Sequence, residues 1–259
     1  MPELPDVEHF REAFALVEGR TVAGVVADPT VVRNATPEAL DRALRSQTFE
    51  HPGRHGKWLI GWTDGPVLLM HFGMTGEVIW SMDVPERHRH DRLILELTDG
   101  EEVRYRNMRK LGGVWLAHDR AEVEALLGSL GPDALDLGKR EFLDRLARRR
   151  GGVKAALMDQ TFVAGVGNLI ADEVLWQARL HPRWRIESLT EDERVRLHSA
   201  MRKVLRTAVG TYDYIATNRS WLLHVRGEPG AVCPRCHTPL ARTVAGGRTT
   251  WFCPACQPE

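Results

Sequence analysis

The residue pattern of the chain changes once, near a segment rich in glycine and proline, and this change limits the possible folds. Between residues 21 and 117, short β-branched and apolar runs alternate with turn residues, which is typical of antiparallel strands. After residues 128–138, which include Pro132, apolar residues recur at helical spacing. A strand-rich half followed by a helix-rich half predicts an α+β protein with more than one domain.

Periodicity and flanking residues assign the individual segments. Helices are expected over residues 6–18 and 37–44, and Asp64-Gly65 and Asp99-Gly100 mark hairpin turns. Strands are expected at residues 22–26, 58–62, 67–72, 77–80, 93–97, 103–105 and 113–116. Further helices are expected at residues 140–149, 152–159, 168–178, 191–209 and 212–217.

The cysteines form two Cys-x-x-Cys pairs near the carboxyl end. They are Cys233, Cys236, Cys253 and Cys256. Two such knuckles supply a tetrahedral thiolate site, so the sequence predicts one structural zinc ion. Arg248 falls near the tip of the β-hairpin expected between the pairs. Two disulfides are the alternative, which only an oxidising compartment would favour.

The amino-terminal stretch Met1-Pro2-Glu3 has two interpretations. If the initiator methionine is trimmed, Pro2 becomes a secondary amine. An α-amino group ordinarily has a pKa of about 7.7–8.0, so part of it is neutral and nucleophilic in cells. Glu3 would then place a carboxylate beside the amine for proton transfer. The alternative is that the proline only stiffens the chain before a helix.

A glycine-rich turn, Gly165-x-Gly167-Asn168, precedes an apolar helix. Backbone N–H groups in such a turn bind phosphate at the start of a helix, and Asn168 can cap that helix or donate to the phosphate. A tight turn between two packed helices is the alternative.

Hydropathy argues against a membrane partner, whereas net charge does not decide for or against nucleic acid. Lys plus Arg equals Asp plus Glu, at 35 each, so net charge gives no indication of a nucleic-acid partner. No apolar run reaches the roughly 18 residues of a membrane span, and the amino terminus lacks the pattern of a secretory signal. We therefore expect a cytoplasmic protein with no membrane partner.

Together these motifs resemble the formamidopyrimidine-DNA glycosylase and endonuclease VIII superfamily of bacterial base-excision repair enzymes. The motifs are residues 1–8, 56–57, 71–76, 109–112, 158–160, 163–168, 171–173, 181–182 and 247–257. The resemblance implies an N-terminal helix with an antiparallel β-sandwich, a helix–two-turn–helix domain and a C-terminal zinc-finger β-hairpin. The corresponding segments are residues 1–127, a linker at 128–139, 140–225 and 226–259.

The resemblance also implies a bifunctional DNA glycosylase and abasic-site lyase that excises oxidised bases from damaged double-stranded DNA, as a monomer at the bacterial nucleoid. Pro2 would form a Schiff base with the sugar, followed by β,δ-elimination. The implied catalytic residues are Pro2, Glu3, Lys57 and Glu173. The implied DNA contacts are His71, Met74, His90, Arg109, Lys154, Asn168 and Arg248, with Met74 and Arg109 as a wedge that fills the gap left by the flipped base.

Three departures from the 8-oxoguanine enzymes leave the lesion open. Leu111 stands where those enzymes have Phe, Asp6 replaces Glu, and the segment between Tyr214 and Cys233 is short. Leucine cannot stack on a base as phenylalanine does. Oxidised purines, oxidised pyrimidines and bulky or alkylated bases therefore stay alternatives, as does a relative that binds damage or abasic sites without cutting.

Overall fold

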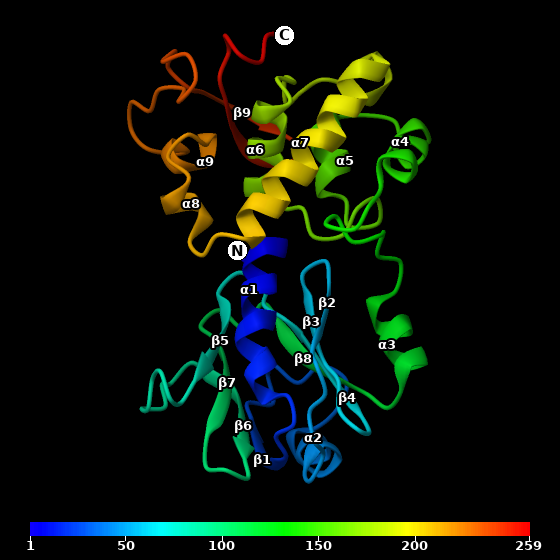
Figure 1. The fold of residues 1–259 in the computed structure, drawn as a ribbon, viewed down its shortest axis with the longest axis vertical. Helices are drawn as coiled ribbons and strands as arrows, with labels where there is room; N and C mark the ends of the chain where they lie inside the picture. Colours follow the sequence, from blue (N-terminus) through cyan, green and yellow to red (C-terminus); the bar gives the residue numbers. More distant parts are fainter. The chain divides into compact units, whose positions relative to one another are not determined.

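The computed structural model describes residues 1–259, and the chain forms two compact units (Figure 1). The sandwich unit comprises Met1–Pro2 and Asp6–Gly128. The helical unit comprises Glu3–Pro5 and Ser129–Glu259. The amino-terminal residues thus divide between the units, with Pro2 in one and Glu3 in the other. The finer division of the chain at residues 127, 139 and 225 stays a prediction.

The sandwich unit contains two four-stranded antiparallel sheets, which confirms the predicted sandwich. One sheet has the order β1-β6-β7-β5, with β1 (Val22–Ala27), β6 (Asp91–Leu97), β7 (Glu102–Asn107) and β5 (Gly76–Trp80). The other has the order β2-β3-β4-β8, with β2 (Gly53–His55), β3 (Trp58–Gly61), β4 (Val67–His71) and β8 (Gly113–Ala117). Their inward apolar side chains form one core, because alternate residues of each strand face the same side.

The turn residues connect the strands as expected. Asp64-Gly65 lies between β3 and β4, and Asp99-Gly100 lies between β6 and β7, each joining an antiparallel pair. Gly100 has a φ of 91°, a conformation that side-chain-bearing residues rarely adopt. The three-residue strand β2 was not predicted, because Gly-Arg-His has no apolar alternation and gains its order from pairing with β3.

Three helices accompany the sheets. Helix α1 (Leu4–Phe14) begins two residues before the helix predicted at residues 6–18. It ends in a tighter 3-10 turn (Ala15–Val17). Helix α2 (Pro37–Leu44) has the predicted bounds, and Thr36 caps it by accepting from the Ala39 N–H. Helix α3 (Arg120–Leu127) was missed, because its periodic apolar signal is weak and its start depends on the Asp119 cap.

The helical unit is built around α6 (Asn168–Gln177). Residues 170–176 of this helix are all buried, as expected for a helix that is apolar on every side. Around it lie α4 (Lys139–Ala147), α5 (Val153–Met158), a 3-10 turn (Ile186–Ser188), α7 (Glu191–Val209), α8 (Tyr214–Thr217) and α9 (Leu222–Val225). The bounds of α7 agree with the prediction because Thr190 and Glu193 form a reciprocal capping box.

The carboxyl end of the chain is the predicted two-stranded hairpin, β9 (Ala241–Ala245) and β10 (Arg248–Phe252), with Gly246-Gly247 at its tip. Both tip glycines have positive φ, and a Cβ on Gly246 would lie 2.6 Å from the terminal methyl carbon of Met158. The tip therefore packs directly against α5. None of the helices is long and apolar enough to span a membrane.

Candidate functional site

Glu3 is anchored at the start of α6. Its side chain is only 1% exposed, and Oε2 accepts hydrogen bonds from the backbone N–H groups of Gly167 (2.8 Å) and Ile170 (3.1 Å). Oε1 accepts a third bond, from the N–H of Leu169 (2.8 Å). Unpaired N–H groups and the dipole at a helix start stabilise an anion. The anion that this turn holds is therefore the carboxylate of Glu3, and not the phosphate that the glycine motif suggested.

Gly167 permits this close approach. A Cβ at Gly167 would lie 2.3 Å from the carboxyl carbon of Glu3, a distance that real Cβ atoms do not show. Gly167 is also the N-cap residue of α6, so the suggestion that Asn168 caps the helix is wrong. Asn168 is instead the first helical residue.

The backbone next to Glu3 is fixed as well. The N–H of Leu4 donates to the carbonyl of Gly165 at 3.1 Å. Gly165 has a φ of 113°, and a Cβ there would overlap the side chain of Leu4. Because Pro2 is bonded directly to Glu3, anchoring of residues 3 and 4 restricts the movement of its nitrogen. This favours the catalytic interpretation of the terminus over that of a stiff helix start.

Glu173, from the middle of α6, is fully buried. Its Oε1 accepts from the Gln177 side chain (2.8 Å), and its Oε2 accepts from the N–H of Leu223 (3.0 Å) in α9. Burial raises the pKa of Glu173 to about 7, although these hydrogen bonds lower it. These contacts describe a residue that holds the start of α9 against α6, so they give no support to the predicted catalytic role.

The pKa of Glu173 predicts a pH-dependent stability. Because the folded pKa of about 7 exceeds the ordinary 4.5, the folded chain binds a proton more tightly, and the unfolding free energy falls as pH rises between these values. In the wild type, this decrease in unfolding free energy should be up to about 3 kcal/mol, since one pKa unit is about 1.4 kcal/mol. In Glu173→Gln, which has no proton to lose, the decrease should be absent. Urea unfolding at pH 4.5 and 8 tests this, with exposed Glu124→Gln as control. Parallel pH dependence in wild type and Glu173→Gln would refute it.

Lys154 does not lie on the surface, so its contacts give no support to its predicted role as a phosphate contact. The side chain is fully buried, and its Nζ pairs with Asp172 Oδ1 at 2.6 Å. The same Nζ donates to Asn168 Oδ1 (2.7 Å) and Thr250 Oγ1 (2.6 Å). Burial lowers the pKa of Lys154, while the neighbouring carboxylate of Asp172 raises it. Lys154 thus joins α5 and α6 to strand β10 of the hairpin.

Asp172 extends this connection, and sequence reasoning missed it. Its Oδ2 accepts from Arg226 Nε at 2.8 Å, and Arg226 Nη2 donates to the carbonyl of Thr249 at 3.1 Å. Asn168 Nδ2 donates to the same carbonyl at 3.3 Å. A buried acid inside an apolar helix needs a partner, which is the only signal in the sequence that could have indicated this role.

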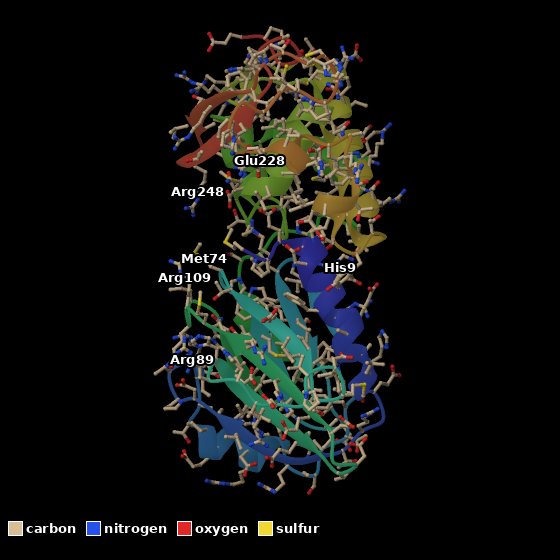
Figure 2. All side chains as sticks on the ribbon, turned by 90° about the vertical axis from the view of Figure 1, so that its left-hand side faces the viewer. His9, Met74, Arg89, Arg109, Glu228 and Arg248 are labelled. Atoms are coloured by element: carbon tan, nitrogen blue, oxygen red, sulfur yellow. The ribbon has the colours of Figure 1, made fainter.

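The connection fixes the strand that carries Arg248. This side chain is exposed at the first residue of β10 and has no hydrogen-bond or ion-pair partner (Figure 2). An unpaired guanidinium on a rigid hairpin suits a phosphate ligand. Asn168 is half-buried, and its side chain is already bonded to Lys154 and Thr249. The predicted phosphate contact therefore requires the side-chain amide to share its N–H groups between Thr249 and the phosphate.

In the sandwich unit, the two predicted wedge residues contact each other. Arg109 Nη1 lies 3.2 Å from the sulfur of Met74, and both side chains are exposed on the same side of this unit (Figure 2). Leu111 is also exposed, at 55%. Exposed methionine and leucine side chains beside an arginine match an element that enters a base stack.

Asn107 holds the two wedge loops together, and it was not predicted. The residue is fully buried, and its Oδ1 accepts from Thr75 Oγ1 and the Lys110 N–H, both at 3.0 Å. Its Nδ2 donates to Tyr105 Oη at 2.6 Å and to the carbonyl of Phe72 at 3.3 Å. No local sequence pattern marks this role, because the partners Thr75 and Phe72 lie more than 30 residues away.

Lys57 and His71 lie close to each other. Lys57 follows Gly56 in the turn between β2 and β3, and His71 pairs with Trp58 across β3 and β4. Burial, and then the charge of Lys57, lower the pKa of His71 to about 4. His71 Nδ1 accepts from the Gly73 N–H at 3.3 Å, so the neutral ring carries its proton on Nε2. His71 would therefore contact phosphate as a neutral donor.

His90 lies at the end of the loop between β5 and β6. Its Nδ1 is 3.1 Å from Arg92 Nη2, and its ring lies against that of His88. Partial desolvation and the positive charge of Arg89 lower its pKa. His88 and His90 have no third metal ligand nearby, because the cysteines form the only cluster able to hold a metal.

The cysteines form the metal centre. Their sulfur atoms lie within 4.8 Å of one another, and none is in a disulfide, which excludes the alternative pairing into two disulfides. Cys233 and Cys253 are buried beside Trp176, whose Nε1 donates to the Cys233 sulfur at 3.4 Å. Four thiolates suit a structural zinc ion and leave no position for a reactive water. The chain has one structural zinc ion, as predicted.

Removal of the zinc is expected to release the hairpin. Without the ion, four sulfur atoms lie close together with little apolar core to hold them. A chelator should therefore abolish specific DNA binding while most helical circular dichroism is retained, and Trp176 fluorescence should change. Metal analysis before and after chelation is the control. Undiminished DNA affinity after complete zinc loss would contradict the prediction.

Three family models match successive parts of the chain. They are the formamidopyrimidine-DNA glycosylase N-terminal domain at residues 1–114, the formamidopyrimidine-DNA glycosylase H2TH domain at residues 130–219, and the zinc finger found in FPG and IleRS at residues 230–258. Two curated relatives named formamidopyrimidine-DNA glycosylase match along their whole length. The protein of Thermomicrobium roseum is 40% identical over 100% of this chain and 99% of its own, and that of Pelotomaculum thermopropionicum is 37% identical over 99% of each.

Solved structures agree with the fold. A complex of inhibited LlFpg with DNA containing N7-benzyl-Fapy-dG superposes with a TM-score of 0.89, at 28% identity, over 100% of both chains. The Lactococcus lactis Fpg bound to DNA containing an abasic site also gives 0.89, at 28% identity, over 99% of this chain and 100% of that one.

Proposed function

Because this chain belongs to the formamidopyrimidine-DNA glycosylase family, we propose that it removes damaged bases from duplex DNA and cuts the strand through the amine of Pro2. It is a DNA glycosylase and abasic-site lyase of base-excision repair. The observation that carries the proposed mechanism is the anchoring of Glu3 on α6, one residue after the proline.

The reaction proceeds through a covalent intermediate. The Pro2 nitrogen bonds to C1′, and the bond from C1′ to the base breaks, with a proton going to the base. The carboxyl group of Glu3 carries protons at the sugar, so that the ring opens and an iminium forms. The iminium acidifies the neighbouring C2′ proton. Its loss expels the 3′ phosphate, and δ-elimination then expels the 5′ phosphate.

The remaining predicted residues divide between the two units. Extruding the damaged base from the stack costs a few kcal/mol. Met74 and Arg109 fill the space that the flipped base leaves. Lys57 acts at the reacting nucleotide by gripping a backbone phosphate beside the lesion. His71, His90, Asn168 and Arg248 contact further backbone phosphates. Removal of Met1 is a condition of the chemistry, because the nitrogen of an internal proline is an amide without a nucleophilic lone pair. We place the enzyme, as a monomer, at the nucleoid in the bacterial cytoplasm, where its DNA substrate lies.

We propose that the damaged base that the enzyme removes is an oxidised base. The segment after α8 folds as the short helix α9 held by Glu173, and exposed Leu111 offers no aromatic face. Both features depart from the pattern of the 8-oxoguanine enzymes. Oxidised pyrimidines and bulky or alkylated bases are therefore competing substrates.

Borohydride trapping on an abasic-site duplex tests the chemistry, and a panel of lesion duplexes identifies the base. A covalent complex of the Met-processed chain with DNA is expected. Specific binding to abasic DNA without any trapped complex would instead support the second candidate, a relative that recognises damage without cutting.

A further inference from the structure

The loop between β5 and β6, residues 81–90, is fixed by one buried arginine. Arg104 is 2% exposed, and its Nη1 donates to the carbonyls of Val84 and Glu86, both at 2.9 Å. Its Nη2 donates to the carbonyl of Pro85 at 2.9 Å. One guanidinium thus holds three successive carbonyls, so the loop has a defined backbone course.

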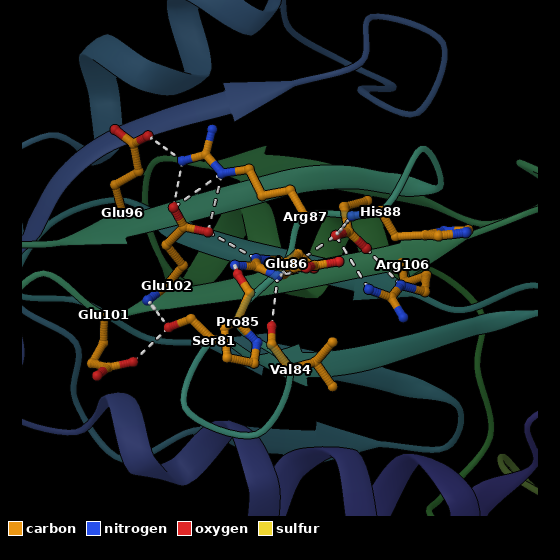
Figure 3. Close-up of polar contacts among 12 residues, drawn as sticks. Ser81, Val84, Pro85, Glu86, Arg87, His88, Glu96, Glu101, Glu102 and Arg106 are labelled. Atoms are coloured by element: carbon orange, nitrogen blue, oxygen red, sulfur yellow. Dashed lines mark hydrogen bonds and ion pairs between the residues drawn. The ribbon is translucent and has the colours of Figure 1, made fainter.

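The two arginines of this loop differ in their partners. Arg87 Nη2 pairs with Glu96 Oε1 at 2.8 Å, and Arg87 also pairs with Glu102 (Figure 3). Arg89 is exposed and has no hydrogen-bond or ion-pair partner. The nearby acid, Asp91, is already bonded to Arg106 and to the His88 N–H. The charge of Arg87 is therefore compensated, whereas that of Arg89 is open to solvent.

Arg89 lies on the side of the sandwich unit that carries the wedge residues. Figure 2 shows it on the same side as Met74 and Arg109. His90 and Arg92 are also close to it, and the lowered pKa of His90 reflects several positive neighbours besides partial desolvation. The area around Arg89 therefore combines unpaired positive charge with a fixed backbone.

We propose that Arg89 binds a backbone phosphate of duplex DNA and that Arg104 is the positioning residue that fixes the loop for this contact. The proposal rests on the proposed function, because the wedge marks which side of this unit faces DNA. An arginine on a fixed loop loses less conformational freedom on binding than one on a mobile loop. Arg89 would extend the phosphate contacts beyond His71 and His90.

The salt dependence of binding tests this directly. Each neutralised phosphate adds about 0.9 to the slope of log affinity against log salt concentration. Arg89→Ala should reduce this slope by about 0.9 on non-cleavable abasic-analogue duplexes, and to a similar extent on undamaged DNA. An unchanged slope would overturn the proposal. Borohydride trapping of the wild-type chain is scored separately, so failure of the proposed chemistry is distinguishable.

Arg87→Ala is the matched control, because it removes the same charge from the same loop. We expect the slope of this variant to equal the wild-type slope within experimental error, since Arg87 is already paired with Glu96 and Glu102. An equal fall in both variants would assign the effect to net charge and overturn the proposal.

Arg104→Met tests the positioning role. It leaves the three loop carbonyls without their donor and should lower the slope about as much as Arg89→Ala, with no further fall in the double variant. A wild-type slope in folded Arg104→Met would refute the positioning role. If this variant does not fold, the comparison of Arg89→Ala with Arg87→Ala still decides the phosphate contact.

Discussion

A chain that retains Met1 is expected to form no borohydride-trapped complex with abasic-site DNA, whereas the trimmed chain forms one readily. In the retained form, the Pro2 nitrogen is a tertiary amide and cannot attack C1′. Glu3 stays on α6 in both forms, because its bonds to Gly167, Leu169 and Ile170 do not involve residue 1. The prediction is therefore a complete loss of trapping with an intact fold.

The comparison requires two preparations of one sequence. Co-expression with methionine aminopeptidase gives the trimmed form, and expression with that aminopeptidase inhibited gives the same sequence with Met1 retained. Mass spectrometry assigns each preparation, and binding to an abasic-analogue duplex confirms that both still recognise DNA. Trapping by a chain shown to retain Met1 would exclude Pro2 as the nucleophile and direct attention to a lysine.

The secondary structure was largely predictable because its signals are local. The capping box at Thr190 and the proline at the start of α2 mark helix starts within a few residues of sequence. Strand β2 and helix α3 lacked such signals, and they form through contacts with β3 and through the Asp119 cap. The zinc ligands were predictable because their spacing alone determines the site.

The environment of each charged residue was not predictable in the same way. The resemblance implied a DNA contact for Lys154, but the side chain is buried against Asp172 and Thr250, and Thr250 lies 96 residues along the chain. Glu3 and Gly167 likewise come together over more than 160 residues. Resemblance supplied the types of residue at the site, while their burial and bonding depend on tertiary packing. Asn107 and Arg104 were missed for this reason.

The second large effect is expected for Glu3→Gln, which should reduce base excision by about 10²–10⁴-fold. Glutamine cannot carry a proton to or from the sugar, yet it occupies nearly the same volume. It also presents one acceptor oxygen to the start of α6, where the carboxylate accepts from Gly167, Leu169 and Ile170. A loss of roughly 1–3 kcal/mol in unfolding free energy should therefore accompany the kinetic effect.

The two effects separate on different substrates. An abasic site needs no base removal, so Glu3→Gln should still give a trapped complex with abasic DNA while lesion DNA stays intact. Gly167→Ala keeps the acid but places a Cβ 2.3 Å from its carboxyl carbon, so it should lower base excision by displacing Glu3. Exposed Glu12→Gln in α1 is the control and should match the wild type. If folded Glu3→Gln releases the damaged base at the wild-type rate, proton transfer at the sugar must come from another group.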